Sequence, residues 1–530
     1  MKMKKLIALL CAGTTLFSVG ALGGCDNNKK ENYDPLNEDQ IKIMVSNLGY
    51  GVEHISQIAK AFESTHPGKS VIVEDTVLSP QLISQLEAGS FIGDICMFND
   101  DVLWKKWRSG MMTPLNDVVE TKPDGDDKTV GEKTVSLETF QMDNGNYYSL
   151  PWMNSVSSYA YNKTALDTLL GAGKWELPKT TSELWTMCDA VQAKGGYGFV
   201  WEGSYLGGAF NAYMAQYNGA EMTTHYYEGE YFDETTQEWK LSDAENVQFI
   251  SMNTGYLRAA EQVEKMIRQY SHKYSRNMSY IQAQAAFAGI GYADDKKLSA
   301  FMPNGDWMYH ETKDYFDSTG HQPGFMRMPI ISDIVETLAF YEDGTTAYSA
   351  LSAEKKSAYD ITLLAIIDYV DGETQTIPQY KGANVSDTDI QKIRDARAVI
   401  SGSAQDSMFI PSNSKKVALA KEFIVFMASD MAVNIYSQYT NGLSPWVTDT
   451  TFSNISFDVP FMQDVLSVVS LSKAFATPHN ELSLYFPKTT SFDQGFGAGT
   501  HTAKMVWEND VKWYKEQWPT ILKNAGLSNN

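Results

Sequence analysis

The stretch that decides the fold is IKIMVSNLGYGVEHISQIAKAFESTHPGKSVIVEDTVLSPQLISQLEAGSFIGDICMF, residues 41–98. Residues 53–66 repeat apolar side chains at the spacing of one helix face. Ser79 followed by Pro80 is typical of the start of a second helix. Three short apolar runs favour strands: residues 41–46, 70–77 and 93–98. The resulting β-α-β-α-β order predicts an α/β fold with an open, largely parallel sheet.

Polar side chains follow the first and the third predicted strand. Asn47 comes directly after the first strand, and Asp100 comes after the third. Ligands of open α/β sheets bind beyond the carboxyl ends of the strands, so we expect both side chains to contact a ligand. Each position has a structural alternative. Asn47 could belong to a turn, and Asp100 could cap the helix that follows it.

Segments along the chain resemble, in the same order, those of the extracellular solute-binding proteins of carbohydrate import systems. They are AKAFESTHPGKSVIVEDTV (59–77), QLISQLEAGSFIGDICMFNDD (81–101), SGMMTPLNDVV (109–119), YYSLPWMNSVSSYAYNKTALD (147–167), LSAFMPNGDWMYHE (298–311), FMRMPI (325–330) and FIPSNSKKVALAKEFIVFMAS (409–429). The shared order, over roughly residues 41–450, is specific to that family. It does not identify the ligand.

The resemblance implies a type II periplasmic-binding-protein-like fold, in which two discontinuous α/β lobes are joined by a hinge and enclose a ligand cleft. The expected N-terminal lobe takes residues 41–150 and 331–432, and the expected C-terminal lobe takes residues 151–330 and 433–530. The chain is then expected to cross between the lobes near residues 150–154, 326–330 and 430–434. Closure of such a hinge around a ligand is a known switching mode.

Two stretches are longer than a minimal member of the family needs. Residues 226–243 have the turn-rich composition of a hairpin insertion. Residues 331–400 contain an apolar helical segment and a polar stretch. Because of these insertions, the ligand cannot be inferred from shorter relatives.

The expected cleft needs flat aromatic rings for the apolar faces of a sugar and polar groups for its hydroxyls. Trp307, in the Gly-x-Trp segment, and Trp152, at the first crossing, are the leading aromatic candidates. Packing between the lobes is the alternative for both. The other candidates lie on predicted loops and turns: Asn154, Trp201, Tyr205, Asn304, Asp306 and Trp446. The tryptophans of the last helical segment are expected to pack.

The N-terminus has the layout of a bacterial lipoprotein signal. Three lysines precede an uncharged apolar run of 17 residues, and Leu22-Gly23-Gly24-Cys25 follows. This resemblance to the lipoprotein box implies that residues 1–24 are removed and that Cys25 is lipidated. An ordinary membrane anchor with an incidental cysteine is the alternative. Residues 25–40 are polar and favour a flexible tether. The expected location is the outer face of the cytoplasmic membrane, held through the lipid alone.

Composition excludes several functions. The formal charge of −22 argues against nucleic acid as a partner, since phosphate binding needs a basic surface. No metal-binding, Walker or nucleophile-elbow motif occurs, so we expect no cofactor, no metal and no catalysis. The acidic turn PDGDDK (123–128) favours a solvated turn over a calcium loop. Cys96 and Cys188 lie in apolar contexts and are expected to be buried free thiols.

Together these features predict a monomeric, lipid-anchored receptor. It would capture a carbohydrate, most readily an oligosaccharide, and deliver it to the permease subunits of an ABC transporter. Several alternatives remain open. Within the binding class, the ligand could instead be a polyol, a sugar phosphate or a peptide. The protein could also be a sugar-sensing receptor of a signalling system, or a surface glycosidase, which needs two carboxylates about 5–10 Å apart.

Overall fold

The computed structural model describes residues 33–47, 49–76, 79–98, 109–142, 144–403, 406–447, 459–475, 482 and 491–527. The predicted signal segment and Cys25 lie outside the described residues. The last part of the predicted tether is not free of the first lobe: the Tyr33 hydroxyl donates to Asp94 (3.0 Å), and the Lys416 ammonium lies 4.2 Å from the centroid of the Tyr33 ring. No helix within the described ranges is both long and apolar enough to span a membrane.

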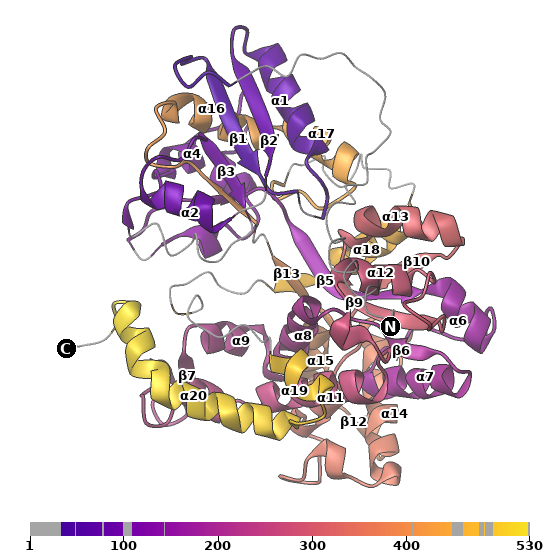
Figure 1. The fold of residues 1–530 in the computed structure, drawn as a ribbon. Coiled ribbons are helices and arrows are strands. Elements are labelled where there is room, and N and C mark those ends of the chain that lie inside the picture. The colour runs from indigo at the N-terminus through magenta and orange to yellow at the C-terminus, as the bar shows by residue number, and fades with distance from the viewer. Residues whose placement is uncertain are drawn as a thin grey trace, which may run out of the picture.

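Two lobes lie one above the other in Figure 1, and the strand β5 reaches up between them. The first lobe is built on a sheet with the order β2-β1-β3-β14-β4. Its strands are β1 (Gln40–Val45), β2 (Ser70–Asp75), β3 (Ile95–Phe98), β4 (Leu150–Pro151) and β14 (Ser407–Phe409). Its helices are α1 (Glu53–Thr65), α2 (Pro80–Glu87), α4 (Asn116–Glu120), α5 (Val130–Lys133), η2 (Leu137–Phe140), α16 (Val417–Met427) and α17 (Asp430–Thr440).

The deciding stretch folds as the sequence predicts. β1 pairs in parallel with β2 and β3. α1 buries Ile55, Ile58 and Phe62, which lie on one helical face. The side chain of Ser79 caps α2 by accepting from the backbone N–H of Leu82 (3.3 Å). β14 joins this sheet antiparallel to β3, so the sheet is mixed.

The second lobe is built on a sheet with the order β15-β13-β5-β9-β6, and β10 also pairs with β5. Its strands are β5 (Ser155–Asn162), β6 (Tyr197–Phe199), β9 (Ser299–Gly305), β10 (Pro323–Met326), β13 (Val399–Ser403) and β15 (Lys473–Phe475). Its longer helices are α6 (Lys163–Leu170), α7 (Thr181–Ala193), α8 (Leu206–Asn218), α9 (Ala220–Tyr227), α11 (Thr254–Gln269), α12 (Tyr280–Phe287), α13 (Met308–Thr319), α14 (Ala353–Val370), α15 (Asp387–Arg397), α18 (Pro460–Ser470), α19 (Ser491–Gly497) and α20 (Ala503–Asn524).

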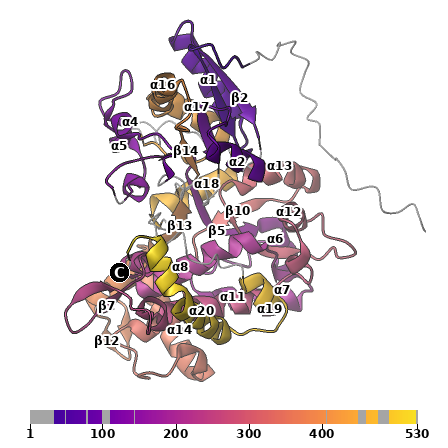
Figure 2. The same ribbon diagram turned by 60° about the vertical axis from the view of Figure 1, so that its left-hand side comes forward.

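Shorter elements complete the second lobe. They are α10 (Gln248–Ser251), η3 (Gly203–Tyr205), η4 (Ser275–Asn277), η5 (Ser332–Thr337), η6 (Tyr348–Ala350) and the hairpins β7 (Glu230–Asp233) with β8 (Glu238–Leu241) and β11 (Gln379–Tyr380) with β12 (Ala383–Asn384). The β7–β8 hairpin confirms the hairpin predicted at residues 226–243. The terminal helix α20 lies along the second lobe in Figure 2. Its side chains Tyr514 and Trp518 are buried in the core of that lobe.

Three passages between the lobes join the described segments of the chain, and only the first is where the sequence placed it. That passage joins β4 to β5. The expected passage at residues 326–330 is wrong, because β10 pairs with β5 inside the second lobe. The second passage instead joins β13 to β14. The expected passage at residues 430–434 is also wrong, because α17 packs in the first-lobe core. The third passage lies between Trp446 and Pro460, and residues 448–458 of it are outside the described residues.

The predicted lobe boundaries need a corresponding correction. Residues 331–399 had been expected in the first lobe, yet Val335, Leu363 and Ile393 are buried in the second-lobe core. The apolar faces of α14 and α15 are buried in that core, where α14 packs against η5 and α15 packs against α8. The segment from Met408 to Trp446, by contrast, packs in the first-lobe core. Residues 433–446, which had been expected in the second lobe, therefore belong to the first. Cys96 and Cys188 are buried free cysteines, as predicted.

Candidate functional site

The two lobes meet where the β1–α1 loop contacts the turn between β9 and α13. A Cβ at Gly49 would lie 2.7 Å from the Cβ of Trp307, so only glycine lets the loop approach this closely. The Trp307 side chain belongs to the second lobe but packs against the core of the first. Tyr205, from η3, brings its ring centroid to 6.1 Å from that of Trp307.

A buried hydrogen-bond bridge lies beside this contact. The Tyr50 hydroxyl, from the first lobe, donates to Asp306 Oδ2 in the second lobe (2.5 Å). Asp306 Oδ1 accepts from the backbone N–H of Val156 (3.1 Å), at the start of β5. Burial raises the pKa of Asp306 to about 7, against the lowering effect of these hydrogen bonds. One carboxyl group therefore connects the first-lobe loop, the tryptophan turn and the first passage.

Aromatic and polar side chains surround the bridge. The Tyr50 ring packs edge-on against His310 (5.5 Å) and Tyr436 (6.3 Å). The His54 ring packs edge-on against Tyr436, with 5.0 Å between the ring centroids. It stacks on Trp152, with 6.0 Å between the centroids and 9° between the ring planes. Burial, followed by the proximity of His310, lowers the pKa of His54 to about 3, so this imidazole is neutral at physiological pH.

Several buried polar atoms of the first lobe and of the second passage have no hydrogen-bond partner among the described residues. They are both ring nitrogens of His54, Nε1 of Trp152, Nε1 of Trp446 and Oδ1 of Asp406. Nearly all buried polar groups in proteins are paired, so a hydrogen-bonding ligand or a bound water would satisfy these atoms. Asp406 lies at the second passage, and burial raises its pKa to about 7.

A cavity of about 510 Å³ opens between the lobes on one side of the bridge. The β1–α1 loop lines it with Asn47 and Tyr50, and α12 and α13 line it from the second lobe. Gln284 Nε2 donates to Glu311 there, and burial raises the pKa of Glu311. The lining offers amide, hydroxyl, imidazole and carboxyl groups, which suit a ligand rich in hydroxyls.

Comparison with known proteins identifies the family of the chain. Residues 50–434 match the family model of bacterial extracellular solute-binding proteins. The chain belongs to this family. No curated protein matches the solute-binding protein in sequence.

Solved structures share its fold. One is a chitin oligosaccharide binding protein, with a TM-score of 0.59 and 16% sequence identity over 90% of this chain and 98% of the other. Another is apo RafE from Streptococcus pneumoniae, with a TM-score of 0.55 and 15% identity over 91% of this chain and 97% of the other. A third comes from work on xylan utilisation by Caldanaerobius polysaccharolyticus, with a TM-score of 0.57 and 13% identity over 90% of this chain and 99% of the other. At these identities the likeness concerns the two-lobe fold alone.

The predicted site residues of the solute-binding protein fall into two groups. The first group lies between the lobes. Asp306 is the acceptor of the bridge, and Trp307 and Tyr205 lie beside it. Asn47 lines the cavity, and its Nδ2 donates to Asp75 (3.0 Å). Asn154 is at the first passage, where its Nδ2 donates to the carbonyl of Ser444 (3.5 Å).

The second group lies inside the lobes. Trp201 had been expected on a loop facing the cleft, but it is 2% exposed and packs in the second-lobe core. Trp152 and Trp446 are buried in the first-lobe core. Asn304 is buried in β9, where its Oδ1 accepts from the N–H of Gly305 (2.8 Å). Asp100 lies outside the described residues.

Sequence reasoning missed Tyr50, His54, His310, Asp406 and Tyr436. A signal was present for Tyr50 and His310, because each lies three residues from a residue that the sequence singled out, Asn47 and Trp307 respectively. His54 and Tyr436 gave no signal, since both sit on ordinary helix faces.

One group on the second lobe could in principle hold a metal. Among the described residues, only His225, Glu228 and Glu230 bring three ligand atoms within 4.8 Å of one another. His225 Nδ1 lies 2.7 Å from Glu230 and 3.0 Å from Glu228, which are ordinary ion-pair contacts. The group belongs to α9 and the β7–β8 hairpin, outside the interlobe region.

Proposed function

We propose that this protein captures a carbohydrate, an oligosaccharide in the first instance, between its lobes by hinge closure and delivers it to an ABC transporter permease. A lipid on Cys25 would hold it at the outer face of the cytoplasmic membrane. The membership of the solute-binding family supports the binding role. The raffinose complex of RafE and the chitin oligosaccharide binding protein support a saccharide as the ligand class.

The observation that carries the proposal is the bridge from Tyr50 to Asp306 beside Trp307. It joins the lobes through groups that meet only when the lobes are together. A ligand can shift an equilibrium only through contacts that differ between the two states. We infer that Trp307 and Tyr205 contact the apolar faces of the sugar and that Asn47 contacts its hydroxyls. Asp306, which is buried and hydrogen-bonded to Tyr50 and Val156, holds the bridge. No catalytic role is proposed for any of these residues.

A thermal-shift screen over a glycan panel tests this function, because a ligand that binds the folded state raises the melting temperature. Hits are then measured by calorimetry, which should give one cleft ligand per chain. Chromatography of the glycan after incubation checks for turnover. Cleaved product in a homogeneous preparation would contradict the binding role, and a panel without any hit would contradict the ligand class.

A further inference from the structure

A second cavity, of about 770 Å³, opens on the second lobe between α7, α11 and α14. These helices lie at the end of the lobe that faces away from the first lobe in both ribbon views (Figures 1 and 2). The cavity shares no lining residue with the interlobe cavity. Its volume falls within the range of small-molecule sites, about 300–1,000 Å³.

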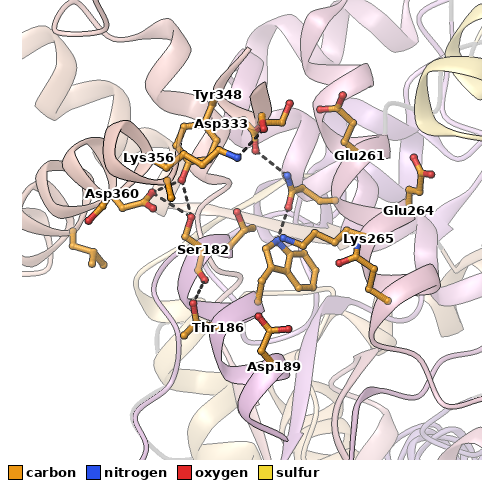
Figure 3. Close-up of a pocket in the computed structure, with 18 of the residues that line it drawn as sticks. Ser182, Thr186, Asp189, Glu261, Glu264, Lys265, Asp333, Tyr348, Lys356 and Asp360 are labelled. Atoms are coloured by element: carbon orange, nitrogen blue, oxygen red, sulfur yellow. Dashed lines mark hydrogen bonds between the residues drawn. The ribbon is translucent and has the colours of Figure 1, made fainter. Parts of the chain in front are cut away.

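A buried carboxyl group at this cavity lacks a partner. Asp333, from η5, is 2% exposed. Its Oδ2 accepts from Gln262 Nε2 (2.8 Å), and Gln262 Oε1 accepts from Trp185 Nε1 (2.9 Å) (Figure 3). Within the described part of the chain, no group donates to Asp333 Oδ1, although this atom is buried. A buried acceptor without a donor is destabilising, and a hydrogen-bond donor on a ligand would satisfy it.

The nearby cation does not neutralise Asp333. The Arg258 guanidinium instead pairs with Glu336 (3.1 Å) and Glu261 (3.1 Å). Burial, reinforced by the charges of Glu336 and Glu261, raises the pKa of Asp333 to about 7. An additional hydrogen-bond donor would therefore stabilise the ionised carboxyl of Asp333.

Ser182, Tyr348 and Asp360 form a second polar network at this cavity (Figure 3). The Tyr348 hydroxyl donates to Asp360 Oδ1 (2.6 Å), and Ser182 Oγ lies 2.9 Å from the Tyr348 hydroxyl. Lys356 Nζ donates to a backbone carbonyl, and Lys265 Nζ lies 5.3 Å from the centroid of the Trp185 ring. No ion pair engages either lysine among the described residues. Hydrogen-bond acceptors and donors thus both line the cavity.

Charges of both signs line this cavity. Lys265, Arg268 and Lys356 contribute cations and five acidic residues contribute carboxyl groups, so a ligand of either charge meets like charges as well as opposite ones. A hydroxyl group, which both donates and accepts, fits such a wall. The Trp185 ring is stacked on Tyr270 (5.3 Å, 5°) and neighbours Lys265, so recognition here relies on hydrogen bonds and not on ring stacking. We propose that the cavity is a second binding site, for a small neutral polyhydroxylated molecule whose hydroxyl donates to Asp333 Oδ1.

Fluorine NMR of the full protein labelled with 5-fluorotryptophan tests this site, because Trp185 is linked to Asp333 through Gln262. The Trp185 signal is assigned with Trp185→Phe. Sorbitol, glucose and sucrose are titrated as probes. We expect a saturable shift with at least one of them, and Trp307→Ala should leave it unchanged. Asp333→Asn and Lys356→Met should each weaken the affinity at least tenfold, whereas the exposed control Asp317→Asn should not.

Three outcomes would overturn the proposal. The first is the absence of a Trp185 shift with all three probes up to the highest soluble concentrations. The second is an unchanged affinity in both Asp333→Asn and Lys356→Met. The third is a larger Trp185 shift with spermidine or inorganic phosphate than with the neutral probes. Lys356 is only half-buried, so Lys356→Met keeps the test valid if Asp333→Asn does not fold.

Discussion

The Tyr50 hydroxyl donates to the buried carboxyl of Asp306 across the two lobes, at 2.5 Å. The same carboxyl accepts from the Val156 backbone N–H, immediately after the first passage between the lobes. A substitution at Asp306 therefore alters hydrogen bonds at the hinge as well as at the contact between the lobes. Because Asp306 precedes Trp307 in the chain, the closing contact and the proposed sugar platform are positioned by one turn.

Tyr50→Phe removes the hydroxyl while keeping the ring against His310 and Tyr436. A hydrogen bond to a charged group contributes about 1.5–3 kcal/mol, so at pH 8 the closed arrangement should lose population. Small-angle X-ray scattering should show a larger radius of gyration for the ligand-free variant. Tyr439→Phe, on the exposed side of α17, is the matched control. Identical scattering from Tyr50→Phe and the wild type would remove the bridge from the closing mechanism.

The pKa of Asp306 predicts how stability depends on pH. The folded state holds the Asp306 proton up to pH about 7, whereas the unfolded chain releases it near the ordinary carboxyl pKa of 3.8. Between these values the folded state binds more protons, so the free energy of unfolding falls as pH rises. Urea titrations should show lower stability at pH 8 than at pH 5, by on the order of a few kcal/mol.

Asp306→Asn isolates the contribution of this group. Asp333 and Asp406 also have pKa values raised to about 7, so the variant should flatten the pH dependence of stability in part and not abolish it. Asp317→Asn, at an exposed helix position, should leave the dependence unchanged. A pH dependence as steep in Asp306→Asn as in the wild type would show that Asp306 ionises normally.

The sequence predicts local structure better than it predicts lobe membership. The 41–98 stretch folds as expected because its strands and helices follow from periodicity and caps. The second and third passages were predicted at the wrong residues, because no local sequence pattern tells which lobe core α14 joins. Likewise, Trp201 and Trp307 both follow a strand in loop-like sequence, yet only Trp307 lies between the lobes. Burial depends on contacts with elements far along the chain, which local sequence does not encode.

Trp201→Ala should therefore act on stability. The side chain is 2% exposed and its indole N–H donates to Ser271. Truncation of a buried large aromatic costs about 3–5 kcal/mol. Denaturant titration should show this loss, and the ligand affinity of the remaining folded protein should stay near the wild-type value. A large loss of affinity with little loss of stability would return Trp201 to the binding site.

Trp307→Ala should show the opposite pattern. Its ring is only half-buried between the lobes, so the loss of stability should be smaller than for Trp201→Ala. Loss of an aromatic anchor should weaken sugar binding by roughly 1–3 kcal/mol in calorimetry. Trp513→Ala, at a 39% exposed position on α20, is the control for a general effect of removing an indole. Unchanged affinity in Trp307→Ala would make it a packing residue.

Gly49→Ala tests the closing contact without removing any polar group. The added Cβ would lie 2.7 Å from the Cβ of Trp307, a distance that real Cβ atoms do not tolerate, so the loop or the turn must shift. Because the contact joins the lobes, the strain is released when they part, and folding should be nearly unaffected. We expect weaker sugar binding, with the loss mainly in the dissociation rate measured by stopped-flow fluorescence. Gly497→Ala, in α19, where the nearest atom is the flexible Arg276 side chain at 3.1 Å, is the control. Wild-type affinity and dissociation rate in Gly49→Ala would show that the lobes do not need this approach to hold the ligand.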